Sequence, residues 1–113
     1  MPHYVIAGGH TDQWKALPFN TDEGRGIAVF EDEERAQRFV DANRESLGPG
    51  WEPKPLWVGQ LVDVLERHAA EEDVHLVVMN PPAVPVASLA GTHEVEVAEI
   101  EDYVRIVRKH YGL

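Results

Sequence analysis

Six histidines have the widest chemical range of any side chains in this 113-residue sequence, because imidazole binds metals and transfers protons. None of them forms a His-x-His or His-x-x-x-His pair, and no glutamate completes a zinc-protease motif. We therefore predict no metal site. A histidine-based metal-binding module stays an alternative, since His3, His10 and His93 would converge if the first and fifth predicted strands were neighbours. The six residues are His3, His10, His68, His75, His93 and His110.

Nucleophiles and phosphate-binding loops are poorly represented. The chain has no cysteine, and its two serines, Ser46 and Ser88, lie in or near predicted loops without a Gly-x-Ser-x-Gly motif. The segment Gly8-Gly9-His10-Thr11 lacks the Lys-Ser/Thr ending and the following helix that a phosphate loop requires. A plain turn is the favoured interpretation of this segment.

Carboxylates are abundant, so their presence alone indicates little. Residues 31–34 are all acidic and suit a solvated helix start. Glu94 and Glu96 would share one strand face about 7 Å apart, which supports acid–base chemistry only if that face is covered. The sequence thus assigns no catalytic residue and no cofactor, and it favours a protein that is not an enzyme.

The segment Asn80-Pro81-Pro82 is the most informative polar feature. It ends a predicted strand beside a rigid turn, and the Asn80 amide can bond nearby backbone there. An alternative function is a binding groove lined by this loop, Trp51 and Trp57, which would suit a peptide or protein partner. A second alternative is a small-ligand or enzyme cleft near Asn80, His93 and the tryptophans.

The elements that must position these residues centre on residues 26–47. Residues 26–30 form an apolar run of strand length, followed by helical spacing with Asp32 as the expected N-cap. Gly48 is the expected helix end. The buried face of the predicted helix contains Ala36, Phe39, Val40 and Leu47.

The other predicted elements follow from hydrophobic periodicity and from turn residues. His68 continues the apolar face of the predicted helix over residues 57–72, which is typical of a hydrogen-bonded core histidine. Three prolines and two glycines exclude regular structure over residues 48–55, while Trp51 and Trp57 should both lie against the core. Strands are predicted over residues 4–7, 14–19, 74–79 and 93–98, the second as an edge strand, a turn over 20–26, and a last helix over 101–110.

This order, β-β-β-α-α-β-β-α, predicts the α+β class and a single domain over residues 1–113. We expect one mixed or mostly antiparallel sheet of four or five strands, with three helices packed mainly on one face.

The net charge of the chain limits the classes of partner that it can bind. A formal net charge of −10 disfavours nucleic acid and anionic membrane surfaces. The chain has neither an apolar run near the ~20 residues that span a bilayer nor a secretory signal pattern, which predicts a cytoplasmic location.

Two segments resemble a known family. Residues 26–36, Gly-Ile-Ala-Val-Phe-Glu-Asp-Glu-Glu-Arg-Ala, and residues 75–81, His-Leu-Val-Val-Met-Asn-Pro, resemble the SseB-like N-terminal domain. The resemblance covers roughly residues 26–82 and implies a small α+β domain of bacterial type without established catalytic residues. The proline-rich segment and the tryptophans depart from the family pattern. Our leading hypothesis is a non-enzymatic protein that acts through protein contacts as a homodimer.

Overall fold

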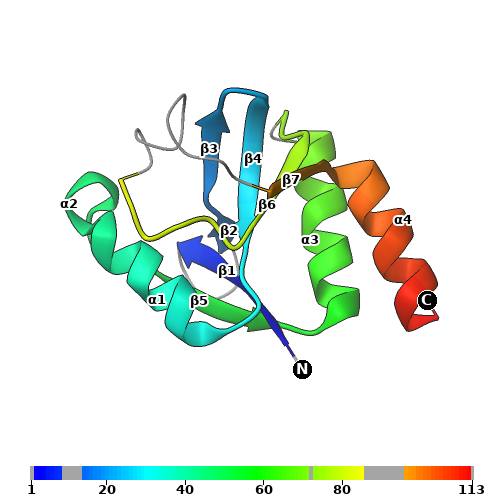
Figure 1. Cartoon of the computed structure of the whole chain (residues 1–113), viewed down its shortest axis with the longest axis horizontal. Helices are drawn as coiled ribbons and strands as arrows, with labels where there is room; N and C mark the ends of the chain where they lie inside the picture. The colour runs from blue at the N-terminus through cyan, green and yellow to red at the C-terminus, as the bar shows by residue number, and fades with distance from the viewer. Residues whose placement is uncertain (1, 9–13, 72, 86–95, 113) are drawn as a thin grey trace.

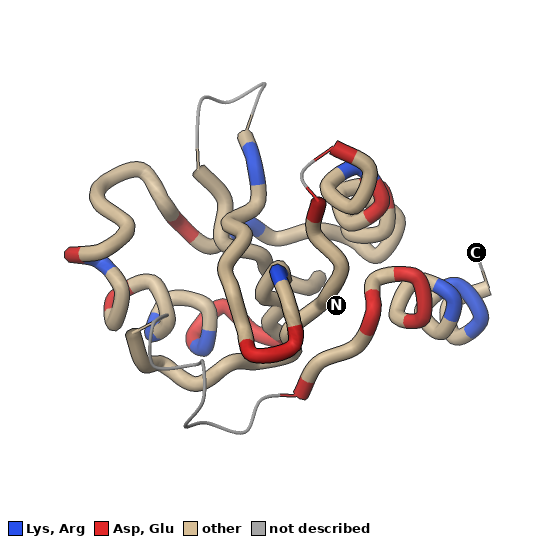
Figure 2. Tube along the Cα trace, turned by 90° about the horizontal axis from the view of Figure 1, so that it is seen from above, with Lys and Arg blue, Asp and Glu red and all other residues tan. Residues whose placement is uncertain are grey.

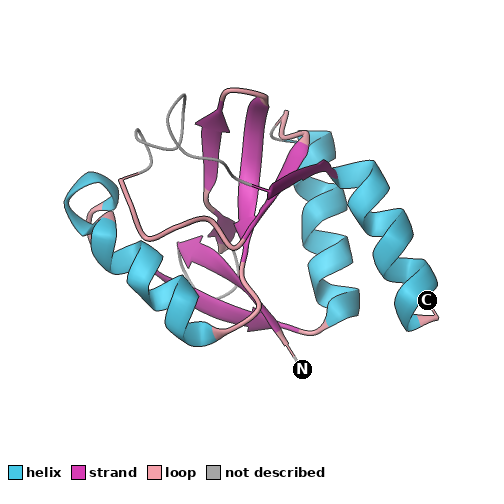
Figure 3. Ribbon diagram, in the orientation of Figure 1, coloured by secondary structure: helices cyan, strands magenta, loops and turns pink. Residues whose placement is uncertain are grey.

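The computed structural model describes residues 2–8, 14–71, 73–85 and 96–112, and these form helices and strands of the α+β class, as predicted. Figures 1 and 3 show the arrangement. The strands are β1 (His3–Gly8), β2 (Lys15–Ala16), β3 (Pro18–Thr21), β4 (Gly24–Val29), β5 (Trp51–Leu56), β6 (Leu76–Met79) and β7 (Glu96–Glu99). The helices are α1 (Glu33–Ala42), α2 (Arg44–Leu47), α3 (Val58–Glu71) and α4 (Ile100–Tyr111).

The described strands divide into two sheets, so the prediction of one sheet was wrong. The first has the order β2-β1-β5 and is antiparallel, and the second has the order β3-β4-β6-β7 with β4 and β6 parallel. Tyr4 and Phe30 exchange two backbone hydrogen bonds of 2.8 Å where the sheets meet. Main-chain hydrogen bonds therefore join the two sheets at this point.

The turn that connects the antiparallel strands β3 and β4 is shorter than the predicted turn over residues 20–26, because only residues 22–23 lie between the strands. Within the tight turn, the Thr21 hydroxyl donates to the Gly24 carbonyl at 2.9 Å and accepts from the Glu23 N–H at 3.2 Å. Gly24 has a φ of 138°, which a residue with a side chain rarely adopts. This local chemistry explains why a turn could be predicted here from the sequence.

The strand and helix predicted over residues 26–47 are confirmed, with the helix divided. Ala36, Phe39 and Val40 are buried as predicted, but Leu47 is only half-buried, so that part of the prediction was wrong. The Asp32 carboxylate accepts a hydrogen bond of 2.8 Å from the Arg35 N–H, so Asp32 is the N-cap of α1, as expected. Asn43 separates α1 from α2, and α2 ends at Gly48, whose φ is 76°. None of the described helices is long and apolar enough to cross a membrane.

The core has two parts on opposite sides of the strands, because alternate residues of a strand point to opposite faces. In β4, Ile27 and Val29 pack with α3 and α4, whereas Ala28 packs with α1. Helices therefore cover both sides, which Figures 1 and 3 also show, and the prediction that they pack mainly on one face was wrong.

The prediction of irregular structure over residues 48–55 was wrong, because β5 occupies an edge position where proline is tolerated. Pro53 and Pro55 pair with Ile6 and Tyr4 of β1. The Tyr4 N–H and C=O bond to Phe30, and the Ile6 C=O bonds to Leu17, so both point away from β5. Each proline thus occupies a position that requires no N–H toward β1.

Candidate functional site

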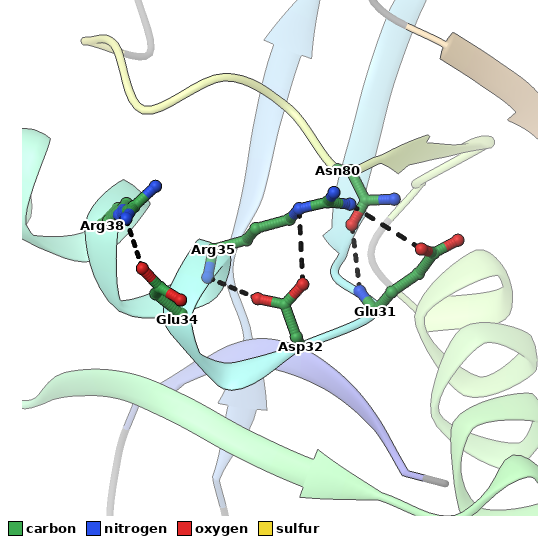
Figure 4. A network of polar contacts seen from close by, with 6 residues as sticks. All are labelled: Glu31, Asp32, Glu34, Arg35, Arg38 and Asn80. Atoms are coloured by element: carbon green, nitrogen blue, oxygen red, sulfur yellow. Dashed lines mark hydrogen bonds and ion pairs between the residues drawn. The ribbon is translucent and has the colours of Figure 1, made fainter.

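Asn80 lies where the parallel strands β4 and β6 end side by side. Its N–H donates to the Val29 carbonyl at 2.9 Å, and its side-chain Oδ1 accepts from the Glu31 N–H at 2.9 Å (Figure 4). Asn80 has a φ of 46°, a conformation that asparagine tolerates better than most residues. Its side chain does bond backbone, but the partner lies 49 positions away in the sequence and not within the turn that the sequence predicted.

The first turn of α1 is surrounded by carboxylate and guanidinium side chains that already pair with one another or with the helix backbone. Besides accepting from the Arg35 N–H, the Asp32 carboxylate pairs with the Arg35 guanidinium at 3.3 Å. That guanidinium also lies 3.7 Å from the Glu31 carboxylate, and Glu34 pairs with Arg38 one turn on (Figure 4). Carboxylates thus occupy the helix N-terminus, which disfavours phosphate or another anion there.

Replacing Asn80 by alanine should lower the free energy of unfolding by about 1–2 kcal/mol, because the Glu31 N–H loses its acceptor and alanine disfavours positive φ. Urea denaturation measures this change. Asn80→Gly removes the same acceptor but tolerates positive φ, so it should cost less than Asn80→Ala. Equal costs for the two variants would contradict the role assigned to the backbone conformation.

The Glu31 carboxylate influences the pKa of both His3 and Tyr103, a grouping that sequence reasoning did not predict. Burial lowers the pKa of His3, and the Glu31 carboxylate opposes this effect. Burial, followed by the proximity of Tyr111 and Glu31, raises the pKa of Tyr103 to about 12. The His3 Nδ1 atom is shielded from solvent and has no hydrogen-bond partner among the described residues.

This group has limited capacity for acid–base chemistry. The Glu31 side chain is 70% exposed and pairs with Arg35, so it is not the desolvated carboxylate that such chemistry requires. The only sequence signal for the position of His3 is its alternation with buried Val5 along β1, which places both on the face toward α3 and α4.

The two tryptophans proposed as groove residues lie at opposite ends of β5. Trp51 packs against the α1 side of the core and covers Gly8, whereas Trp57 follows the strand and is 63% exposed. The strand geometry separates their backbones by roughly 20 Å, too far to share one small groove.

The expectation that Trp57 lies against the core was wrong. The backbone N–H of Trp57 donates to the Gln60 side chain at 2.9 Å, and its backbone carbonyl accepts from the Leu61 N–H. The backbone of Trp57 therefore begins α3. The preceding residue, Leu56, occupies the buried position, which leaves the indole of Trp57 in solvent.

The histidine predictions have different outcomes. His68 is a satisfied core histidine, as predicted: it is 3% exposed and both ring nitrogens have backbone partners. His10 and His93 lie outside the described residues, so the cleft alternative, which includes His93, stays a prediction. Within the described ranges, no three histidine or carboxylate side chains are grouped to hold a metal ion.

The outward face of α4 combines apolar and charged side chains. Ile106, in the middle of the helix, is 63% exposed, and Tyr111 near its end is 50% exposed. The first turn carries Glu101 and Asp102, and the last turn carries basic residues, a separation that Figure 2 shows along the helix. These basic residues are Arg108, Lys109 and His110. We call the surface formed by Asp102, Ile106, Lys109 and His110 the α4 face.

Comparison with known proteins adds no family to this description. No protein-family model matches the sequence, and no curated protein matches it. The geometry of the described residues is therefore the basis for assigning function.

Proposed function

We propose that this protein is a non-enzymatic interaction domain that forms a homodimer through the α4 face. The observation that carries the proposal is Ile106, a large aliphatic side chain that is 63% exposed at the centre of a helix. Burial of such a residue against a partner is favourable, because it removes apolar surface from water. The charged residues on either side of Ile106 favour a second copy of this chain as the partner.

The charges of the α4 face are complementary in sign to those of a second copy, although Asp102 also pairs with Arg105 of its own helix. Asp102 precedes Ile106 by about one helical turn, and Lys109 and His110 follow it by about one turn, so all project near the same side. If two copies pair antiparallel about a two-fold axis at Ile106, each Asp102 faces the basic end of the partner. Two such contacts offset part of the repulsion between chains that each carry a formal charge of −10.

The sheet edges are less suited to self-association than this helix. β5 has prolines at positions 53 and 55, and β3 begins with Pro18, which removes backbone donors. β7 carries Glu96 and Glu99, whose charges would repel those of a second copy. The helix face therefore supports a homodimer better than pairing between strands of two copies.

Related arguments agree with an interaction role. The resemblance of residues 26–82 to SseB-like domains implies no catalytic residue, and the acidic composition suits a cytoplasmic protein with protein partners. The α4 helix is about 18 Å long, so the interface that it can form is small. We expect a dissociation constant on the order of 10 μM.

Replacing Ile106 by glutamine should weaken dimerisation at least about tenfold, because it removes the central apolar contact. Sedimentation velocity over a protein concentration series measures the dissociation constant. Trp57→Gln is the matched control, since Trp57 is equally exposed, at 63%, but is not part of the α4 face. A wild-type protein that stays monomeric at about 0.5 mM would contradict the proposal, as would weakening by Trp57→Gln alone.

Charge exchange tests the antiparallel register. Asp102→Lys or Lys109→Asp alone should weaken the dimer, because each places like charges opposite one another. The double variant should restore most of the affinity, since each copy then presents the reversed but complementary pair. Failure of the double variant to recover, with the helical circular dichroism unchanged, would exclude this register.

A further inference from the structure

A second feature, independent of the α4 face, is an open recess where β1 ends beside β5. It has a volume of about 410 Å³ and is lined by the ends of both strands and by Trp14. Lys54 pairs with Val5 and Glu52 pairs with Ala7, so both side chains lie on the face of the sheet that Val5 shares with α3. The volume falls within the range of small-molecule sites, about 300–1,000 Å³.

The recess presents a cation, an anion and an aromatic ring together. The Lys54 ammonium lies 4.9 Å from the centroid of the Trp14 ring, close enough for a cation–π contact that holds it in place. Glu52 is two residues before Lys54, which places the two backbones about 7 Å apart on the same face of β5. Among the described residues the Glu52 side chain has no ion-pair partner.

The two small residues at the end of β1 leave room for the recess. Ala7 and Gly8 line it, and Trp51 packs against Gly8 so closely that a Cβ added there would lie 2.6 Å from the indole. Glycine is therefore required at this position, and Trp51 buttresses the strand end that forms part of the recess. Trp51, which the sequence predicted as a groove residue, therefore supports the strand and does not line the recess itself.

We propose that this recess binds a free apolar amino acid. The ligand carboxylate would pair with the Lys54 ammonium, the ligand ammonium with the Glu52 carboxylate, and its aliphatic side chain would contact Trp14. The protein's formal charge of −10 opposes an anionic ligand, and Lys54 opposes a cationic one. A zwitterion satisfies both charged groups and has no net charge to be repelled.

Titration with L-leucine, followed by ¹H–¹⁵N correlation spectra, tests the proposal. The Trp14 indole N–H and the amides of Ala7, Gly8 and Lys54 should shift together, with a dissociation constant on the order of 1 mM. Leucinamide lacks the carboxylate and 4-methylpentanoate lacks the amine, so each should bind at least about tenfold more weakly. No shift at Trp14 with tens of millimolar L-leucine would overturn the proposal, as would equal binding of all three compounds.

Two variants assign the charged contacts. Lys54→Met and Glu52→Gln should each weaken L-leucine binding at least about tenfold while the remaining spectrum keeps its native dispersion. Arg38→Gln and Glu45→Gln change exposed charges of α1 and α2, so they are matched controls that should leave binding unchanged. Binding that is unaffected by Lys54→Met would exclude the recess as the site. Since these residues lie outside the α4 face, the outcome is independent of dimerisation.

Discussion

Replacing Phe39 by alanine should lower the free energy of unfolding by about 4 kcal/mol, the largest effect that we expect for a single substitution. Phe39 is fully buried on α1, and its ring centroid lies 5.5 Å from that of Phe30 and 6.0 Å from that of Phe19. Removing the ring leaves a cavity and deletes both aromatic contacts. Since a domain of this size is stable by only about 5–15 kcal/mol, urea denaturation should show the loss clearly.

The matched variant is Phe39→Leu, which keeps an apolar side chain and fills most of the volume. It should cost about 1–2 kcal/mol, well below the cost of alanine. In thermal unfolding, Phe39→Ala should lower the midpoint by about 15 °C. A cost below about 1 kcal/mol for Phe39→Ala would show that α1 does not pack on this side of the sheet as described.

Replacing His68 by leucine should lower the free energy of unfolding by about 2–3 kcal/mol, although leucine is apolar and has a similar volume. The Ala16 N–H donates to His68 Nε2 at 3.2 Å, and Nδ1 lies 2.8 Å from the Val64 carbonyl. Because Nε2 must be the acceptor, the neutral ring carries its proton on Nδ1, which donates to Val64. Leucine cannot accept the Ala16 hydrogen bond and leaves a buried N–H unsatisfied.

Two measurements separate this mechanism from simple loss of packing. Hydrogen exchange at the Ala16 amide should become faster in His68→Leu than the change in global stability explains. His75→Leu is the control, because the His75 side chain is 67% exposed and should change stability by less than about 0.5 kcal/mol. If Ala16 exchange follows global stability alone, the hydrogen bond to His68 is not what holds β2.

Local sequence signals predicted the segment from β4 to α2 well. The strand β4 is a short apolar run, and α1 starts at Asp32, a residue type that commonly caps helices. The helical segment ends at Gly48, a glycine with positive φ. Each of these signals acts within a few residues, so it can be recognised without knowing the tertiary structure. The same is true of the core position of His68, which follows from helical spacing.

Non-local pairing explains what the sequence did not predict. Pro53 and Pro55 predict a break in any strand when the sequence is considered alone. In the structure they pair with β1 at positions where β5 does not have to donate an N–H. The partner of the Asn80 side chain is equally inaccessible, because Glu31 becomes its neighbour only when β4 and β6 align. The expectation that large aromatic residues are buried failed for Trp57, since Leu56 occupies the buried position at the end of β5.

The influence of Glu31 on the pKa of His3 and Tyr103 also depends on tertiary structure. The three residues come from the first strand, the segment before α1 and the last helix, so no motif joins them in the sequence. Ile106 is exposed because the neighbouring Val104 and Val107 occupy the buried face of α4.

The parallel pairing of β4 with β6 has a consequence for folding during synthesis. Gly26 of β4 pairs with Leu76 of β6, about fifty residues later, so α1, β5 and α3 all emerge from the ribosome before that contact can form. Closing so long a loop costs entropy before any native contact compensates for it, which slows folding. Until β6 arrives, the apolar edge of β4 is exposed, and the nascent chain is most prone to aggregate in that interval.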